Sequence, residues 1–73
     1  MISVILVDDH PILRTGLRFL LEEEEDIQVA AECGDGWEAI ELVSRHKPDV
    51  VVMDLALPGL SGLDATREIR QRG

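Results

Sequence analysis

The sequence is poor in cysteine, aromatic residues and basic residues, and these shortages exclude several classes of protein. A single cysteine, Cys33, cannot form an internal disulfide, so a disulfide-stabilised small fold is excluded. Seven lysines and arginines against fifteen acidic residues give a net charge of -8, which disfavours direct nucleic-acid contact by this segment. No apolar run approaches the ~20 residues that cross a membrane, and Met1 opens no basic signal sequence. We therefore expect a cytoplasmic protein without a membrane partner.

The apolar content is nevertheless that of a folded protein. Apolar residues make up 45% of the 73 residues and the mean hydropathy is +0.05, whereas disordered chains lack the apolar surface needed to collapse. A chain of this length buries only about 60–65% of its unfolded surface, so we expect a globular fold of small stability.

Strand-like and helix-like segments alternate along the chain. The first and third strand-like segments are short apolar runs rich in β-branched residues, which is typical of strands buried in a parallel sheet. The second has more polar residues, as suits the edge of a sheet. Right-handed crossovers place such strands in one sheet with helices on its faces, which is an α/β fold. The predicted strands are Ile2–Val7, Ile27–Glu32 and Val50–Met53, and the predicted helices begin at Pro11, Trp37 and Leu63, the second ending at Lys47 and the third at Gly73.

The first predicted helix carries leucines at the spacing of one helical stripe, which we expect to face the sheet. This stripe consists of Leu13, Leu17, Leu20 and Leu21.

Carboxylates follow two of the predicted strands. Asp8 and Asp9 come directly after the first strand, and Asp54 comes directly after the third. Ligands bind at the carboxyl edge of α/β sheets, and the three carboxylates converge there if the first strand lies between the other two. Each close pair would repel by about 4 kcal/mol at an effective dielectric near 20, so a cation is expected. Oxygen ligands favour Mg²⁺ or Mn²⁺, here with water and a backbone carbonyl from the Leu55–Ala56 loop.

A metal-bound carboxylate cluster suits phosphoryl transfer. A divalent cation neutralises the oxygens of an incoming phosphoryl group, so that a carboxylate can attack phosphorus. Asp54 is the stronger candidate for this phosphoacceptor because it stands alone on its strand, whereas Asp8 and Asp9 are adjacent and can hold metal. The alternative is that the Asp pair caps a helix and that Asp54 belongs to a turn. Their common position after buried strands weakens it. His10 has a phosphoryl-relay or metal-ligand interpretation, but a single histidine there favours a helix cap or a solvent-exposed side chain.

Three runs of the sequence, ILVDDHPILRTGLRFLLE, DGWEAIEL and PDVVVMDLALPGLSGLDATREIR, resemble the receiver domain of bacterial response regulators. The opening DDHP and the GLRFLLE helix are most similar to the NarL/FixJ-like subclass, which carries a LuxR-type helix-turn-helix output domain. The resemblance covers essentially all 73 residues. It implies a flavodoxin-like fold with parallel strands in the order 2-1-3, and phosphorylation by a sensor histidine kinase.

The resemblance also implies a role for individual residues. Asp54 matches the phosphoacceptor, and Asp8 and Asp9 match the acidic pair that binds Mg²⁺. Ala56 matches the residue whose backbone carbonyl completes the metal site. The loop that shapes the pocket matches at Pro58 and Gly62.

The chain departs from the family pattern by covering three of its five βα units. Residues 1–73 are therefore expected to be the N-terminal portion of a receiver domain, without the fourth-strand Ser/Thr, the fifth-strand Lys or the output domain. The intact parent would regulate transcription through its DNA-binding domain. The uncovered edge of Val50–Met53 carries neither charge nor proline, so we expect a homo-oligomer that joins these edges or exchanges a βα element between its subunits.

Two other functions remain open from the sequence. One is a Mg²⁺-dependent phosphatase or phosphotransferase with an Asp nucleophile. This function is disfavoured because such enzymes carry Asp-x-Asp after a strand, whereas here the first strand is followed by Asp8, Asp9 and His10. The other is a degenerate receiver that acts only through protein contacts, and the presence of all three acids argues against it. We therefore expect a signalling switch that is not an enzyme.

Overall fold

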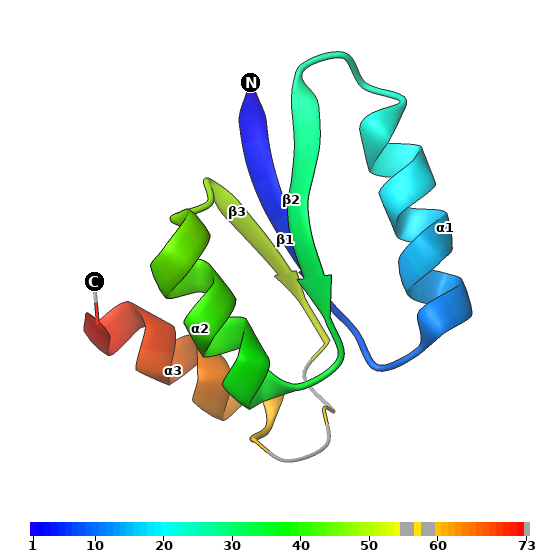
Figure 1. Cartoon of the computed structure of the whole chain (residues 1–73). Coiled ribbons are helices and arrows are strands. Elements are labelled where there is room, and N and C mark those ends of the chain that lie inside the picture. The colour runs from blue at the N-terminus through cyan, green and yellow to red at the C-terminus, as the bar shows by residue number, and fades with distance from the viewer. Residues whose placement is uncertain (55–56, 58–59, 73) are drawn as a thin grey trace.

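The computed structural model, which describes residues 1–54, 57 and 60–72, contains a parallel sheet covered by helices on both faces (Figure 1). Within these residues the strand order is β2-β1-β3, which confirms the predicted order 2-1-3. Helix α1 lies on one face, and α2 and α3 lie together on the other. The elements are β1 (Ile2–Val7), α1 (Pro11–Glu22), β2 (Ile27–Cys33), α2 (Gly36–His46), β3 (Val50–Met53) and α3 (Gly62–Arg72).

The central strand β1 forms the middle of the core. Its last four residues, 4–7, are at most 3% exposed, because the strand has a neighbour on each side and helices over both faces. On the face covered by α2, Ile5 and Val7 pack with Cys33, Ala39 and Leu57. The core is thus built around the strand that ends at the predicted acidic pair.

The pairing of β1 with β2 changes register partway along the strands. Val4 pairs with Val29, but the next residue, Ile5, pairs with Ala31, so that Ala30 is passed over. Beyond this shift Val7 pairs with Cys33. The strand β2 therefore runs one residue past the predicted end at Glu32.

The predicted leucine stripe of α1 is only half correct. Leu17 and Leu21 are partly buried, but Leu13 is 53% exposed and Leu20 is 65% exposed. The helix packs mainly against β2, so its side nearer to β3 stays open. A groove of about 350 Å³ lies there, with Leu13, Leu17 and Val52 among its lining residues.

The helix ends differ from the predicted ones by single residues with clear local causes. Helix α2 begins at Gly36 because the Asp35 carboxylate accepts a hydrogen bond of 2.8 Å from the backbone N–H of Glu38. It ends at His46, since Lys47 adopts a left-handed conformation with φ of 48°. Helix α3 begins one residue earlier than predicted, and the predicted end at Gly73 lies outside the described residues.

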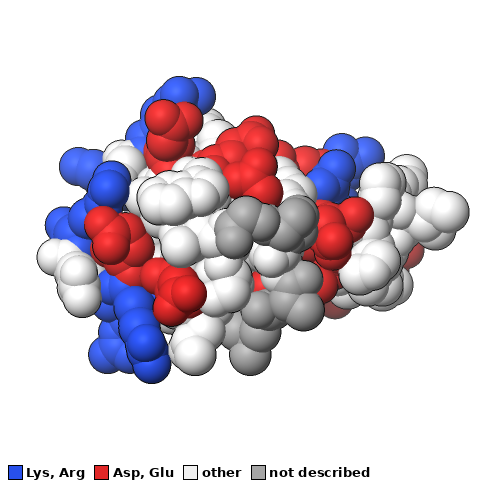
Figure 2. Space-filling model, turned by 90° about the horizontal axis from the view of Figure 1, so that it is seen from below, with Lys and Arg blue, Asp and Glu red and all other residues white. Residues whose placement is uncertain are grey.

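The carboxyl ends of the strands share one edge of the molecule (Figure 1). Figure 2 looks onto this edge and shows acidic side chains toward its middle, with basic side chains nearer the outline. Among the described residues, no helix is both long enough and apolar enough to pass through a membrane.

Candidate functional site

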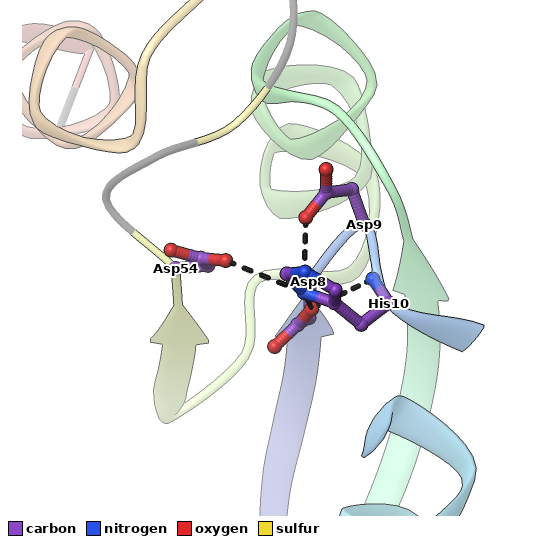
Figure 3. Close-up of side chains that lie close together, drawn as sticks. All are labelled: Asp8, Asp9, His10 and Asp54. Carbon is purple, nitrogen blue, oxygen red and sulfur yellow. Dashed lines mark hydrogen bonds and ion pairs between the residues drawn. The ribbon is translucent and has the colours of Figure 1, made fainter. Parts of the chain in front are cut away.

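Backbone hydrogen bonds hold the acidic residues at the ends of β1 and β3. The Asp8 N–H donates to the Cys33 carbonyl at 3.0 Å, and the Asp54 N–H donates to the Val7 carbonyl at 2.9 Å. The hydrogen bonds of the sheet therefore continue one residue past each strand, so the backbone that carries both carboxylates is held in the sheet. Asp9 follows directly in the chain, and Figure 3 shows all three carboxylates facing a common centre.

His10 completes this cluster. One oxygen from each carboxylate and one ring nitrogen of His10 lie within 4.8 Å of one another. The His10 Nδ1 atom is 2.8 Å from Oδ1 of Asp8, 3.2 Å from Oδ1 of Asp9 and 3.9 Å from Oδ2 of Asp54. The structure thus brings together all the acidic residues predicted from the sequence, together with a histidine.

His10 occupies the N-cap position of α1 and its side chain is 66% exposed, in line with the expected helix cap or solvent-exposed side chain. Its backbone there is extended, and its side chain makes no capping hydrogen bond. Instead its ring lies over the carboxylates, and its backbone N–H donates to Oδ1 of Asp8 at 2.8 Å. The adjacency of His10 to Asp8 and Asp9 was the only sequence signal for this arrangement.

The contacts between His10 and the carboxylates shift pKa values in opposite directions. The pKa of Asp8 is lowered, chiefly by the hydrogen bond from the His10 backbone N–H and further by the His10 side chain. The pKa of His10 is raised, first by its hydrogen bond to Asp8 and then by the charge of Asp9. Both shifts favour an imidazolium ion beside carboxylates, which is the response expected of clustered negative charges.

A second set of contacts joins α1 to the site. Arg14 donates from Nε to Glu32 at 2.9 Å and from a terminal nitrogen to the Asp8 carbonyl at 2.8 Å. Arg18 donates to the other Glu32 oxygen at 2.8 Å. This bridge fixes the backbone of Asp8 against both α1 and β2. This bridge could not be predicted from the sequence, because neither the helix pattern nor the strand pattern indicates which charged residues meet.

The donor set fits a hard divalent cation. Three carboxylates from two strand ends supply oxygen ligands, and the side chains of Asp9 and Asp54 are 35% and 25% exposed, which leaves room for water ligands. Ala56, predicted to add a backbone carbonyl, lies outside the described residues, as does Pro58 of the predicted pocket loop. Gly62, the other predicted loop residue, is the buried first residue of α3.

Comparisons with known proteins give one consistent result. The family model of the response regulator receiver domain matches residues 4–73. The nitrate/nitrite response regulator protein NarP of Escherichia coli is 47% identical over 71 residues, covering 97% of this chain and 33% of NarP. A LuxR-family two-component response regulator from Aurantimonas sp. SI85-9A1 has a TM-score of 0.94 at 50% identity, covering 99% of this chain and 51% of that one.

The same fold is found in the response regulator domain of a protein that is not named as a LuxR-family regulator. The response regulator domain of Thermotoga maritima CheB has a TM-score of 0.97 at 34% identity, covering 100% of this chain and 55% of that one. The chain therefore spans between about a third and about half of the length of these matches.

Proposed function

The chain belongs to the response regulator receiver family, and from this premise we propose that Asp54 is its phosphoacceptor and that Asp8 and Asp9 hold Mg²⁺ beside it. The phosphoryl donor is a sensor histidine kinase. The observation that carries this proposal is the convergence of three carboxylates from two adjacent strand ends, with ligand atoms within 4.8 Å of one another.

Family membership fixes the broader context. The chain is a receiver portion of a two-component response regulator, and its relatives include LuxR-family regulators. Its strands, in the order β2-β1-β3, form part of a flavodoxin-like receiver fold, as the sequence resemblance implied. In the proposed parent, residues 1–73 are the N-terminal portion of the receiver domain. A C-terminal helix-turn-helix domain binds DNA there and regulates transcription in the cytoplasm.

The geometry favours Asp54 over Asp8 as the nucleophile. The Asp54 side chain is 25% exposed, whereas that of Asp8 is 13% exposed. An Asp54 oxygen bonds to phosphorus as the phosphorus–nitrogen bond of the donor phosphohistidine breaks, and the electron pair stays on the donor nitrogen. Bound Mg²⁺ would supply neutralisation of the phosphoryl oxygens during this transfer.

Phosphorylation in the presence of Mg²⁺ tests the assignment. Acetyl phosphate or a histidine kinase should add one phosphoryl group, detected by mass spectrometry, to the wild-type chain and to Asp26→Asn. Asp26 is an exposed turn residue between α1 and β2, so this variant is the matched control. Asp54→Asn should remain unlabelled, and undiminished labelling of Asp54→Asn would refute the proposal. Residues 1–73 alone span three of the family's five βα units, and we expect this segment by itself to be labelled about 10²–10³-fold more slowly than a complete receiver domain.

A non-enzymatic switch fits the comparisons better than a phosphatase or a phosphotransferase. Receiver domains of transcriptional response regulators are generally not enzymes, and the match to CheB covers its response regulator domain. The proposed switch is labelled stoichiometrically and does not turn over. Multiple turnover of a simple phosphate ester that depends on Asp54 would favour the alternative Asp-nucleophile enzyme. Labelling abolished by Asp54→Asn would exclude a degenerate receiver.

The partners of the chain, besides the kinase, include a second copy of itself. The edge of β3 that faces away from β1 has no neighbouring strand among the described residues, and Val50 and Val52 are 45% and 41% exposed. These features support a homo-oligomer that joins β3 edges. Light scattering over a dilution series should show self-association, and a folded monomer at micromolar concentration would contradict it. The net charge of -8 supports the absence of direct nucleic-acid contact by this segment.

A further inference from the structure

Arg14 makes two hydrogen bonds that link α1 to β2 and to the end of β1. Its Nε atom donates to Oε1 of Glu32 at 2.9 Å, and its terminal Nη1 atom donates to the backbone carbonyl of Asp8 at 2.8 Å. The guanidinium group is planar, so two bonds from it fix its orientation as well as its distance from each acceptor. The side chains of Arg14 and Glu32 are 21% and 24% exposed, so both are sheltered from most of the solvent.

Glu32 is itself held in place by a second arginine. Arg18, one helical turn later on α1, donates to Oε2 of Glu32 at 2.8 Å, so both oxygens of this carboxylate accept from the helix. Glu32 therefore cannot turn away from Arg14 without breaking another charged hydrogen bond. Among the described residues, the hydrogen bonds and ion pairs of Arg18 go to Glu32 and Glu22, and none goes to the acidic residues of the site.

The turn after β2 packs against the end of the guanidinium group. A Cβ atom added to Gly34 would lie 3.3 Å from Nη1 of Arg14, and 3.8 Å from both the Asp8 carbonyl oxygen and the Cα atom of Asp9. The turn, the terminal nitrogen of Arg14 and the backbone of the acidic pair are therefore in close contact at one point. The absence of a side chain at Gly34 leaves this space to Arg14.

The bond from Arg14 acts on the part of the site that the sheet does not hold. Asp8 and Asp54 directly follow strands, and their N–H groups donate to carbonyls of neighbouring strands. Asp9 lies one residue further, and within the described part of the chain its backbone makes no hydrogen bond to a neighbouring strand. The Asp8 carbonyl belongs to the peptide group that joins Asp8 to Asp9, so the bond from Arg14 restrains the direction in which Asp9 leaves the sheet.

We propose that Arg14 is a positioning residue of the metal site, which holds the Asp8–Asp9 peptide so that the Asp9 carboxylate faces the other two. The inference rests on the proposed Mg²⁺ site. Arg14 acts through the backbone and contacts neither the metal nor the phosphoryl group, and Glu32 orients its guanidinium group. Groups that orient metal ligands in this way change metal affinity by about 10–100-fold when they are removed.

The positive charge of Arg14 would have a direct effect of the opposite sign. A guanidinium group repels Mg²⁺, so an arginine that acted only by its charge would weaken the binding of the metal. Arg14→Lys separates the two effects, because lysine keeps the charge but lacks the planar fork that spans both acceptors. A positioning role therefore predicts weaker Mg²⁺ binding by Arg14→Lys, whereas an effect of charge alone predicts unchanged binding.

The chain offers two comparison variants of the same kind. Arg18→Lys loses a bond to the same Glu32 carboxylate, but Arg18 reaches Asp8 only through Glu32 and Arg14. Its effect on Mg²⁺ binding should therefore be smaller than that of Arg14→Lys. Arg67 lies on α3, where its ion pair is with Asp64 on the same helix, so Arg67→Lys should bind Mg²⁺ like the wild type.

NMR titrations of the full chain with Mg²⁺, followed by the amide shifts of the three aspartates, test the proposal. Arg14→Lys should raise the Mg²⁺ concentration at half-saturation by about 10-fold. In the metal-free chain, the ¹⁵N order parameter of the Asp9 amide should fall from the rigid value of about 0.85 toward the flexible range below about 0.6 in Arg14→Lys alone. Far-UV circular dichroism checks that each variant is folded.

The possible outcomes separate this inference from the proposed function. Unchanged half-saturation in Arg14→Lys, or an equal shift in Arg18→Lys, would overturn the positioning role. Labelling of the wild type at Asp54 would leave the proposed function standing in either case. A wild-type chain that neither binds Mg²⁺ nor becomes labelled at Asp54 would overturn both.

Discussion

The start of α2 offers a sensitive test of how the structure is packed. Gly36 is buried, and a Cβ atom added to it would lie 3.1 Å from both the carbonyl carbon and the Cβ of Leu60, with the Leu60 carbonyl oxygen closer still. The obstacle is mainly backbone, so it cannot move aside as the end of a flexible side chain would. Gly36→Ala therefore forces α2 and the segment before α3 apart.

The expected cost follows from this overlap. Overpacking of a well-packed site costs about 1–3 kcal/mol. At about 2.1 cal/mol/K per residue, the 73-residue chain has an unfolding entropy near 0.15 kcal/mol/K, so each kcal/mol lowers Tm by about 7 °C. Gly36→Ala should thus lower Tm by roughly 7–20 °C.

Gly16 in α1 is the matched control, because a Cβ there would meet nothing within 4 Å. Gly16→Ala should raise stability by about 0.5–1 kcal/mol through better helix propensity and a smaller loss of chain entropy. Thermal unfolding followed by circular dichroism measures both variants, and Trp37 fluorescence reports on α2 directly. A Gly36→Ala variant as stable as the wild type, or equal losses in both variants, would refute the packing described here.

Three further predictions concern stability and reactivity. Asp35→Ala removes the cap of α2 and should cost about 1 kcal/mol in urea unfolding, and an unchanged midpoint would contradict that role. Glu32→Gln weakens the bridge to Arg14 and should cost about 1–3 kcal/mol, with faster amide exchange in α1; exchange unchanged in α1 would count against the bridge. Burial raises the pKa of Cys33 from 9.0 to about 11, so its alkylation at pH 8 should be much slower in the folded than in the unfolded chain. As the pH rises, the thiol ionises in the unfolded chain before it ionises in the folded chain. Its contribution to the free energy of unfolding is therefore fully present below pH 9 and falls as the pH rises toward 11. A free energy of unfolding that does not change across that range would contradict this prediction.

The sequence predicted the strands well because their signal is local. Short β-branched runs located the first and third strands, and a more polar run located the second. The position of Asp8 and Asp54 after the two buried strands indicated the edge where they meet. The inner stripe of α1 was less predictable. Periodicity identifies residues on one side of a helix, but the width of the buried part depends on what covers it, which left Leu13 and Leu20 exposed.

Most polar contacts of the site could not be predicted from the sequence. The bridge from Arg14 to Glu32 joins residues eighteen positions apart on different elements. Its formation depends on how α1 is positioned against β2, and neither composition nor residue spacing predicts that position. The orientation of His10 depends likewise on the backbone angles before α1, so the sequence offered only its adjacency to the acidic pair.

The register shift at Ala30 has an evolutionary consequence. Side chains alternate between the two faces of a strand, and the passed-over residue resets that alternation: Ala31 and Cys33 face α2, while Glu32 faces the arginines of α1. If β2 continued in regular register past Val29, Ala30 would pair with Ile5 and Glu32 would pair with Val7, in the apolar layer under α2. The passed-over residue therefore keeps Glu32 with the arginines. A chain without this one residue would keep Glu32 and Cys33 on their present faces, so relatives with a regular strand here should carry a one-residue deletion, whereas a second insertion would move both side chains to the wrong face.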